Sequence, residues 1–459
     1  MAIEAKDVAI IGGGFAGLSA GVALADQGFR VALLESKPAL GGRAYSFPDP
    51  DSEDFVDNGQ HVLMGCYHAT LAFLKLIGTR DRLVAQRHLA IEMLEGPGRR
   101  AMVRTLPLPG PLHMAGAILG YRHLTITQRA RLASAGARLL YMRRFARPRL
   151  AGMTVAEFMD LSGQGERARN CFWYPLAIAT LNEDPALASA ALLAEVMKRA
   201  FFSRRGDSAF LYATVGLSDL YCEAARNFIE RRDGVVACHA IVEQFELDAD
   251  GRIARLRLRD GRSLGAANFI AAVTPDRLLK MLPEGAATDP AFSGLGEIKS
   301  SPIICVHLWL DREVTQSSFI GFIGTTTQWL FNKRRIFAQH GQNHPGYLSF
   351  VISGARHLVD RPNDELLAMV VDDLHAMLPA SRQAQVIKAL VLKEKQATIA
   401  ADPQSDARRP SLATPIANLF LAGDWIQTGL PATIESAVVS GHAAAAAVVA
   451  RTAAGESRR

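Results

Sequence analysis

The sequence predicts an α/β protein whose parallel sheet is assembled from both ends of the chain. Residues 8–35 follow the pattern of a strand, a glycine turn, a helix and a second strand. Residues 419–441 follow the pattern of a strand, a glycine turn and the start of a helix. Between these two segments the 459-residue chain alternates helical and strand-like patterns, which predicts an inserted α+β domain.

The N-terminal unit has the features of a dinucleotide-binding fold. Val8–Ile11 is apolar and rich in β-branched residues, as a buried parallel strand requires. Gly12, Gly14 and Gly17 follow in G-x-G-x-x-G spacing, which permits a tight turn, a close pyrophosphate and close packing of helix on strand. Glu35 ends the second strand, where its carboxylate can bind a ribose diol that has no 2′-phosphate. The cofactor contacts that we expect here are Gly12, Gly13, Gly14, Phe15, Ala16, Gly17, Glu35 and Ser36.

Two further glycine turns favour FAD over NAD as the cofactor. Gly41-Gly42-Arg43 follows the second strand, where its glycines and guanidinium can approach the same diphosphate. Near the C-terminus, Leu419–Ala422 predicts a buried strand, and Gly423-Asp424 turns out of it with a carboxylate for ribityl hydroxyls. The helix that starts at Pro431–Glu435 can point N–H groups at the flavin edge where negative charge collects on reduction. The contacts expected from these segments are Gly41, Gly42, Arg43, Gly423, Asp424, Thr433 and Ile434.

The dinucleotide-binding domain is therefore predicted to be discontinuous and Rossmann-like. Residues 1–75, 215–290 and 405–459 form the FAD-binding domain, and residues 76–214 and 291–404 form the substrate domain. Apolar spacing predicts helices at 128–145, 153–159, 168–181, 186–202, 218–229, 363–378 and 384–390. Alternation and turn residues predict strands at 235–237, 241–247, 253–258, 269–273, 303–310, 329–332 and 347–353. Val242, in one of these strands, is expected to face the adenine.

Composition excludes several classes of protein. The five cysteines form no C-x-x-C pair and the histidines have no metal-ligand spacing, so we expect neither a disulfide framework nor a metal site. The chain enters its first strand within about seven residues, which predicts no signal peptide and a cytoplasmic protein. No uninterrupted apolar run looks long enough to cross a bilayer.

An arginine-rich segment is the second informative feature of the sequence. Residues 99–149 contain eleven arginines and no Asp, Glu or Lys, a local charge of +11 in a chain of net charge +6, which leaves −5 elsewhere. A proline-broken apolar stretch, 105–121, leads into the predicted helix 128–145. A basic amphipathic segment favours peripheral contact with anionic lipid at the inner face of the cytoplasmic membrane. The alternative is a solvated basic helix whose apolar face lies in the core. Nucleic-acid binding is disfavoured, because no aromatic residues alternate with the arginines and no binding motif is present.

Several segments resemble a known family. The GxGxxG–Glu–GGR start and the GD–helix end resemble the flavin amine oxidase and carotenoid desaturase superfamily. The whole chain is similar to the hydroxysqualene dehydroxylases, also called squalene-associated FAD-dependent desaturases. Asn182-Glu183 departs from the pattern, because a Thr is expected after the Asn. The segments that carry this resemblance are FVDNGQHVLMGCY (55–67), FWYPLAIATLNEDPALASA (172–190), PIICVHLWLD (302–311), QWLFNK (328–333), KEKQATIAADP (393–403) and GDWIQTGLPATIESAVVSG (423–441).

The resemblance implies an amine oxidase-like fold and a reaction. The reaction is reductive removal of the hydroxyl of hydroxysqualene to give squalene, with FAD as the hydride donor and an external source of electrons. Gly59, Gln60 and His61 lie in a segment that resembles a flavin-proximal loop, so the resemblance implies that they contact the cofactor. His61 is the candidate acid and Asp57 is a second candidate. The alternatives are that His61 only hydrogen-bonds the cofactor or the loop, and that Asp57 is a turn or cap acid. The residues that we expect in the substrate pocket are Trp329, Trp425 and Pro431.

Two other functions remain open on the sequence. One is an FAD-dependent desaturase of isoprenoids or an amine oxidase, which would remove hydride instead of adding it. The segment LPATIE has no aromatic residue where amine oxidases often place one, which disfavours an amine substrate. The other is a lipid carrier that keeps FAD without catalysis.

Overall fold

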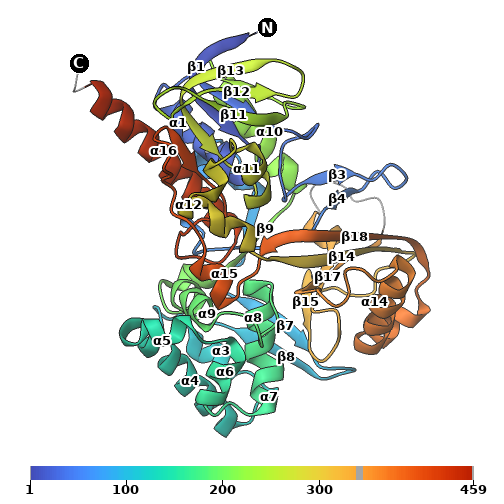
Figure 1. Ribbon diagram of the computed structural model, residues 1–459. Coiled ribbons are helices and arrows are strands. Elements are labelled where there is room, and N and C mark those ends of the chain that lie inside the picture. The colour runs from blue at the N-terminus through green and yellow to red at the C-terminus, as the bar shows by residue number, and fades with distance from the viewer. Residues whose placement is uncertain (1, 338–344, 457–459) are drawn as a thin grey trace.

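A mostly parallel sheet forms the centre of the first domain (Figure 1). The computed structural model describes residues 2–337 and 345–456. The strand order of this sheet is β10-β2-β1-β13-β12-β11, and β19 pairs with β13. Strands β10, β2, β1, β13 and β19 are parallel, whereas β12 and β11 continue the sheet in antiparallel pairing. The bounds are β1 (Ala2–Ile11), β2 (Val31–Leu34), β10 (Val235–Ala237), β11 (Val242–Leu247), β12 (Ile253–Leu258), β13 (Ser263–Ala271) and β19 (Leu419–Leu421).

Helices from distant parts of the chain cover one face of this sheet. Helices α1 (Phe15–Asp26), α10 (Leu217–Glu230) and α16 (Ile434–Glu456) pack on Val8 and Ile10, while alternate residues such as Ala9 face a second core. Figure 1 shows α16 running beside α1. A Cβ atom on Gly441 would lie 2.3 Å from the carbonyl oxygen of Ala16, so these helices pack backbone to backbone. The Rossmann-like fold is therefore confirmed.

Helix α16 differs from expectation in one respect. Its segment Ile434–Ala454 is long and apolar enough to cross a membrane by length and composition, although no such segment was expected. Val438 and Val448 are fully buried in the core that α16 shares with α1 and the sheet. In this structure α16 therefore packs as a helix of the first domain.

A second sheet forms the frame of the substrate domain. Its strand order is β18-β14-β17-β16-β15-β7-β8, and helix α14 (Asn363–Met377) packs on one face through Leu366, Val370 and Leu374. All its strands lie within 76–214 or 291–404, and all strands of the first sheet lie within 1–75, 215–290 or 405–459. The bounds are β7 (Ala90–Leu94), β8 (Arg100–Arg104), β14 (Ser300–Leu310), β15 (Phe319–Phe322), β16 (Trp329–Asn332), β17 (Gly346–Ser353) and β18 (Val386–Ile399).

Two sequence predictions for this region need correction. The helix predicted at 384–390 is wrong, because these residues enter strand β18, which pairs with the long strand β14 at the edge of the sheet. Pairing along β14 overrides the helix-forming Ala, Leu and Lys residues of the segment. Phe292 and Leu295, just beyond the predicted boundary at 290, pack in a core of the first domain.

Helices α3–α9 form a third layer below the two sheets (Figure 1). Helix α4 buries Leu132, Ala135, Leu139 and Met142, so the face predicted to meet lipid lies in the protein core. The alternative, a solvated basic helix with its apolar face in the core, describes α4 correctly. The bounds are α3 (Met114–Leu119), α4 (Ile126–Phe145), α5 (Arg147–Ala151), α6 (Val155–Leu161), α7 (Glu166–Ala168), α8 (Tyr174–Leu181) and α9 (Ala190–Val196).

Short elements connect these layers. The hairpin β3–β4 reaches the second sheet, where the indole N–H of Trp309 donates to Asp54 at 2.8 Å. The remaining bounds are β3 (Ser46–Pro48), β4 (Phe55–Asp57), β5 (Leu63–Met64), α2 (His68–Leu76), β6 (Leu83–Ala85), β9 (Phe210–Ala213), α11 (Pro275–Met281), α12 (Pro290–Ser293), α13 (Lys333–Ile336) and α15 (Pro403–Ala407).

Candidate functional site

The first glycine turn has the geometry that its spacing predicts. Gly12 has a φ of 109°, and a Cβ there would lie 2.3 Å from the carbonyl oxygen of Ala272. A Cβ on Gly17 would lie 1.9 Å from the carbonyl oxygen of Gly12, so only glycine lets the helix approach the strand this closely. The Oε2 atom of the Glu35 carboxylate accepts a hydrogen bond from the Gly13 N–H at 2.7 Å. The acid at the end of β2 therefore lies against the turn.

The second glycine turn lies directly against the first. Gly42 has a φ of 62°, and a Cβ on it would lie 3.2 Å from Cα of Gly14. The hydroxyl of Tyr221 donates to the carbonyl oxygens of Gly41 and Ala44, both at 2.9 Å. Tyr221 comes from α10 and was not predicted from the sequence. Its role is to hold the second turn in place.

The C-terminal turn at Gly423-Asp424 lies against the second glycine turn, although the two are far apart in the sequence. Asp424 forms an ion pair with Arg43, so the GGR and GD segments are in contact. Arg409, whose side chain is almost completely buried, donates to the carbonyl oxygens of Asp424 at 2.8 Å and Ile426 at 2.7 Å, and also to that of Leu430. Arg409 was not predicted either, because a single arginine in a loop has no pattern that distinguishes it.

A cavity of about 280 Å³ opens where the loop that holds residues 59–61 faces the start of α16. The predicted residues Gly59, Gln60 and His61 form part of its wall, opposite Thr433 and Ile434. The structure thus brings together residues that are about 370 positions apart in the sequence. Most of the wall is hydrocarbon, with Val62, Met64, Leu181, Val196, Phe210, Ile303, Trp329, Phe331, Val351, Leu430 and Pro431.

The predicted substrate-pocket residues divide into two groups. Trp329 and Pro431 line the cavity. Trp425 does not: its ring is buried in a core of the first domain, and its N–H donates to the carbonyl oxygen of Val273 at 2.8 Å. The prediction for Trp425 therefore needs correction. Val242 lies at the start of β11, two residues after Ala240, whose N–H donates to the carbonyl oxygen of Glu35.

The structure disfavours Asp57 as a catalytic acid. Its Oδ1 accepts the N–H of Leu217 at 3.1 Å, in the first turn of α10, and its Oδ2 accepts from the ammonium of Lys333 at 2.6 Å. Asp57 is therefore a helix-capping and ion-paired residue, as the alternative reading of the sequence had it. Glu435 is similar, because it caps α2 through the N–H groups of Ala69 and Thr70, both at 2.9 Å.

His61 is poorly suited to act as a general acid. Burial lowers the pKa of its imidazole, and the ammonium of Lys333 lowers it further, against the opposing effect of Asp57. A lowered pKa favours the neutral ring, whose single N–H can donate a hydrogen bond but is too weak an acid to protonate a leaving hydroxyl. In the described part of the chain, Nε2 of His61 is buried without a hydrogen-bond partner. This atom is available for a bound molecule.

These features fit an extended dinucleotide. The N-cap residue of α1 is Gly14, which has no side chain to cap the helix, so the first N–H groups of α1 remain for a diphosphate beside the two glycine turns. The unpartnered Nε2 of His61 lies in the wall of the cavity that α16 faces. The two N-terminal glycine turns, the turn at Asp424 and the start of α16 can therefore hold FAD together.

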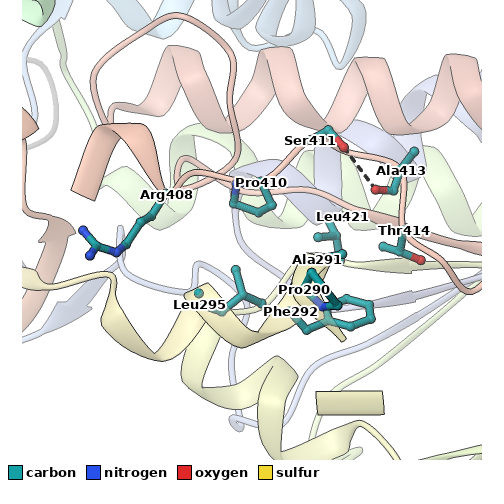
Figure 2. Close-up of a pocket in the computed structure, with 11 residues that line it drawn as sticks. Pro290, Ala291, Phe292, Leu295, Arg408, Pro410, Ser411, Ala413, Thr414 and Leu421 are labelled. Atoms are coloured by element: carbon teal, nitrogen blue, oxygen red, sulfur yellow. Dashed lines mark hydrogen bonds between the residues drawn. The ribbon is translucent and has the colours of Figure 1, made fainter. Parts of the chain in front are cut away.

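A second pocket lies elsewhere and has no part in this site (Figure 2). It measures about 200 Å³ and is lined by residues such as Phe292, Leu295 and Thr414. None of the predicted cofactor residues lines it. The guanidinium of Arg408 at its rim is paired with Glu297 at 2.6 Å.

Comparison with known proteins identifies the family. Residues 15–449 match the model of the flavin containing amine oxidoreductases. The chain belongs to this family. A hydroxysqualene dehydroxylase from Rhodopseudomonas palustris is 29% identical over 97% of this chain and 99% of its own length. A 15-cis-phytoene desaturase from Synechococcus elongatus is 26% identical over 97% of this chain and 96% of its own length.

Solved structures support the fold of this flavin containing oxidoreductase. Cyclohexylamine oxidase from Brevibacterium oxydans matches with a TM-score of 0.73 at 16% identity, over 98% of this chain and 99% of its own. A putrescine oxidase bound to putrescine matches with a TM-score of 0.71 at 14% identity, over 97% and 99% of the two chains. The predicted amine oxidase-like fold is therefore confirmed. The cofactor of this flavin-dependent oxidoreductase is FAD, as the sequence predicted.

Proposed function

We propose that the protein is a hydroxysqualene dehydroxylase, which removes the hydroxyl of hydroxysqualene to give squalene and water. The observation that carries this proposal is the cavity, whose wall is largely hydrocarbon but holds Gln60 and Thr433 where the flavin-proximal loop meets α16. A long isoprenoid alcohol needs both kinds of surface. The dehydroxylase relative at 29% identity over almost the full chain supports the same substrate class.

The reaction breaks the carbon–oxygen bond of an allylic alcohol and forms a carbon–hydrogen bond. The hydroxyl leaves with a proton as water, and the allylic carbon gains a hydride, which reduced FAD supplies when bound. The chain's own residues bind the hydrocarbon tail along Phe210, Trp329 and Phe331, orient the alcohol, and exclude bulk water. The electrons come from an external reductant that reloads the enzyme after each turnover.

An amine substrate fits this cavity less well. Glu435 is the carboxylate among the described residues of the wall, and both its oxygens are engaged at the N-terminus of α2. No free anion is therefore offered to an ammonium group by the described wall. A desaturase that removes hydride from an isoprenoid hydrocarbon could use the same apolar surface, and the phytoene desaturase relative keeps this as the second candidate function.

One experiment separates these two reactions. The FAD-loaded protein is photoreduced without oxygen and mixed with hydroxysqualene, and the visible flavin band and the products by mass spectrometry are followed. Reoxidation of the flavin with formation of squalene supports the dehydroxylase. The matched reaction mixes oxidised protein with phytoene and an electron acceptor. A new conjugated product there, without any squalene in the first reaction, assigns the enzyme to the desaturases.

We also propose that the protein docks peripherally on an anionic membrane through part of the predicted arginine-rich segment 99–149, the part that precedes the body of α4. Five side chains between the end of β8 and the start of α4 are 40–81% exposed: Leu106, Leu108, Leu112, Leu119 and Ile126. We call this set the apolar turn. Exposed arginines, Arg104, Arg122 and Arg131, lie in the same stretch of chain. Exposed leucines flanked by arginines suit the boundary between acyl chains and anionic headgroups.

The apolar turn is held as one surface. The Leu106 N–H donates to the carbonyl oxygen of His113 at 2.9 Å, and Leu106 packs on Gly116 of α3. Arg129 binds the carbonyl oxygens of Tyr121 at 3.0 Å and Leu124 at 2.9 Å, which fixes the loop to α4. Helix α4 in turn packs on α9, and Val196 of α9 lines the cavity. We propose that a substrate dissolved in a bilayer enters from this side.

Vesicle flotation tests the docking surface. Leu112→Asp with Leu119→Asp should abolish flotation with vesicles that contain phosphatidylglycerol, because two carboxylates replace the inserted side chains. Ile387→Asp is the matched control, since Ile387 is 58% exposed on the edge strand β18. Flotation of the double variant equal to that of the control would rule this surface out. Binding of the wild type should weaken with salt.

A further inference from the structure

A buried lysine connects the two domains beside the cavity. Lys333, at the start of α13, has no exposed side-chain surface. Its Nζ donates to Oδ2 of Asp57 at 2.6 Å and to Oε1 of Gln60 at 2.9 Å, and it lies 4.0 Å from the centre of the Phe337 ring. Oδ1 of Asp57 is fixed by the N–H of Leu217. The carboxylate therefore holds the ammonium in one place, and the ammonium holds the amide of Gln60.

This contact determines which way the Gln60 amide faces. An ammonium only donates hydrogen bonds, so Gln60 must present its oxygen to Lys333 and its NH₂ group to the other side. Gln60 forms part of the cavity wall. Within residues 2–337 and 345–456, its Nε2 has no hydrogen bond to a protein acceptor. An amide donor of fixed orientation is thus offered to whatever occupies the cavity.

We propose that Gln60 donates this hydrogen bond to the hydroxyl oxygen of the substrate, and that Lys333 is the positioning residue that keeps the amide in the donating orientation. This inference rests on the proposed function, because a pure hydrocarbon has no oxygen to accept the bond. A donor that is already oriented costs no reorganisation when the substrate binds or when charge develops on the departing oxygen. The pair therefore distinguishes the alcohol from its hydrocarbon product.

Binding to the oxidised holoenzyme tests the inference without turnover. The dissociation constants of hydroxysqualene and of squalene are measured from the change each causes in the flavin absorbance. Gln60→Leu should raise the dissociation constant of hydroxysqualene about tenfold, which is the effect of losing one hydrogen bond. The dissociation constant of squalene should not change. Gln60→Glu can still accept a hydrogen bond from Lys333 but offers no N–H to the cavity. It should therefore lose the preference for hydroxysqualene over squalene to the same extent as Gln60→Leu. Arg335→Met removes a nearby exposed cation and should change neither constant.

The role of Lys333 is tested by a double-mutant cycle. Lys333→Met lets the Gln60 amide rotate, so the dissociation constant of hydroxysqualene should rise by a few-fold to tenfold while that of squalene stays the same. The double variant Gln60→Leu with Lys333→Met should lose no more preference than Gln60→Leu alone, because the lysine acts through the glutamine. If Lys333→Met does not fold, Lys333→Gln replaces it in the cycle, because a glutamine amide can still donate to Asp57 but can both donate and accept, so it no longer fixes the orientation of Gln60.

The outcomes separate two failures. If the wild type forms squalene and prefers hydroxysqualene, but Gln60→Glu keeps that preference, the assignment of Gln60 is wrong and the proposed function stands. If the wild type neither forms squalene nor prefers the alcohol, the proposed function fails and this inference fails with it.

Discussion

Arg43 and Asp424, which are 381 residues apart in the chain, form an ion pair between the two turns that flank the cofactor site. The side chain of Asp424 is 8% exposed and that of Arg43 is 31% exposed. The contact joins a turn that follows β2 to a turn that follows β19. Two segments from opposite ends of the sequence are thereby held at the spacing that one dinucleotide requires.

Removing one partner of this pair should weaken FAD binding. Arg43→Ala leaves the carboxylate of Asp424 without its partner, and we expect a loss of about 1–2 kcal/mol, a factor of roughly 5 to 30 in the FAD dissociation constant. Reconstitution of the apoprotein, followed by flavin fluorescence, measures it. Asp424→Asn combined with Arg43→Ala should cost less than the sum of the two single changes. Strict additivity would show that the pair is not coupled in the site.

The contact between the two glycine turns can be tested in the same assay. Gly42→Ala places a methyl group 3.2 Å from Gly14, where the diphosphate is expected, so FAD affinity should fall at least tenfold. Gly28→Ala is the control, because Gly28 also has a positive φ, of 83°, but a Cβ there meets nothing within 4 Å. The control should lose about 1 kcal/mol of stability and keep its FAD affinity. Equal FAD affinities for the two variants would contradict the prediction that the two glycine turns together bind the diphosphate.

Local patterns were sufficient to predict the cofactor half of the structure. The spacing of Gly12, Gly14 and Gly17 requires particular backbone geometry, and the turn has that geometry. The amphipathic helix predicted at 128–145 forms as α4 with one buried face, because 3.6-residue periodicity is a local property. What that face meets could not be deduced, since a protein core and a lipid surface demand the same side chains.

Long-range contacts account for what sequence analysis missed. Tyr221, Lys333 and Arg409 act through partners far away in the chain, so no short pattern marks them. The first residues of strand β18 were assigned to the helix predicted at 384–390, because this edge strand carries charged residues such as Lys388 that interrupt its apolar alternation. Trp425 lies beside a cofactor motif in the sequence, but its ring turns into the core.

Replacing Arg409 should be among the most damaging single changes in the first domain. Arg409→Leu removes the donors to the carbonyl oxygens of Asp424, Ile426 and Leu430, which are left without these partners in the interior. We expect a loss of about 3–5 kcal/mol in the free energy of unfolding, measured by urea titration of the holoenzyme. Arg408→Leu is the matched control: its exposed side chain pairs with Glu297, and its loss should be within about 1 kcal/mol. Similar urea midpoints for the two variants would contradict a stabilising role for the hydrogen bonds of Arg409.

His307 should make the protein less stable in mild acid. Its imidazole is fully buried between the hydroxyl of Tyr347 at 3.0 Å and the thiol of Cys305 at 3.3 Å. Burial, and then the ammonium of Lys333, lowers the pKa of His307 to about 3. Between an unfolded pKa of about 6.5 and that value, the unfolded chain binds a proton that the folded chain does not, so stability falls as the pH falls.

His307→Gln tests this sign directly, because glutamine does not titrate. The wild type should lose up to about 1.4 kcal/mol per pH unit more than the variant between pH 6.5 and pH 3, the effect of one proton. Urea unfolding at pH 6.5, 5.5 and 4.5 measures the difference, and equal denaturant slopes at each pH would confirm that the same surface unfolds. Other buried histidines, such as His61 and His113, contribute equally to both proteins and cancel in the comparison. Parallel pH profiles would mean that His307 takes up its proton in the folded protein as readily as in the unfolded chain.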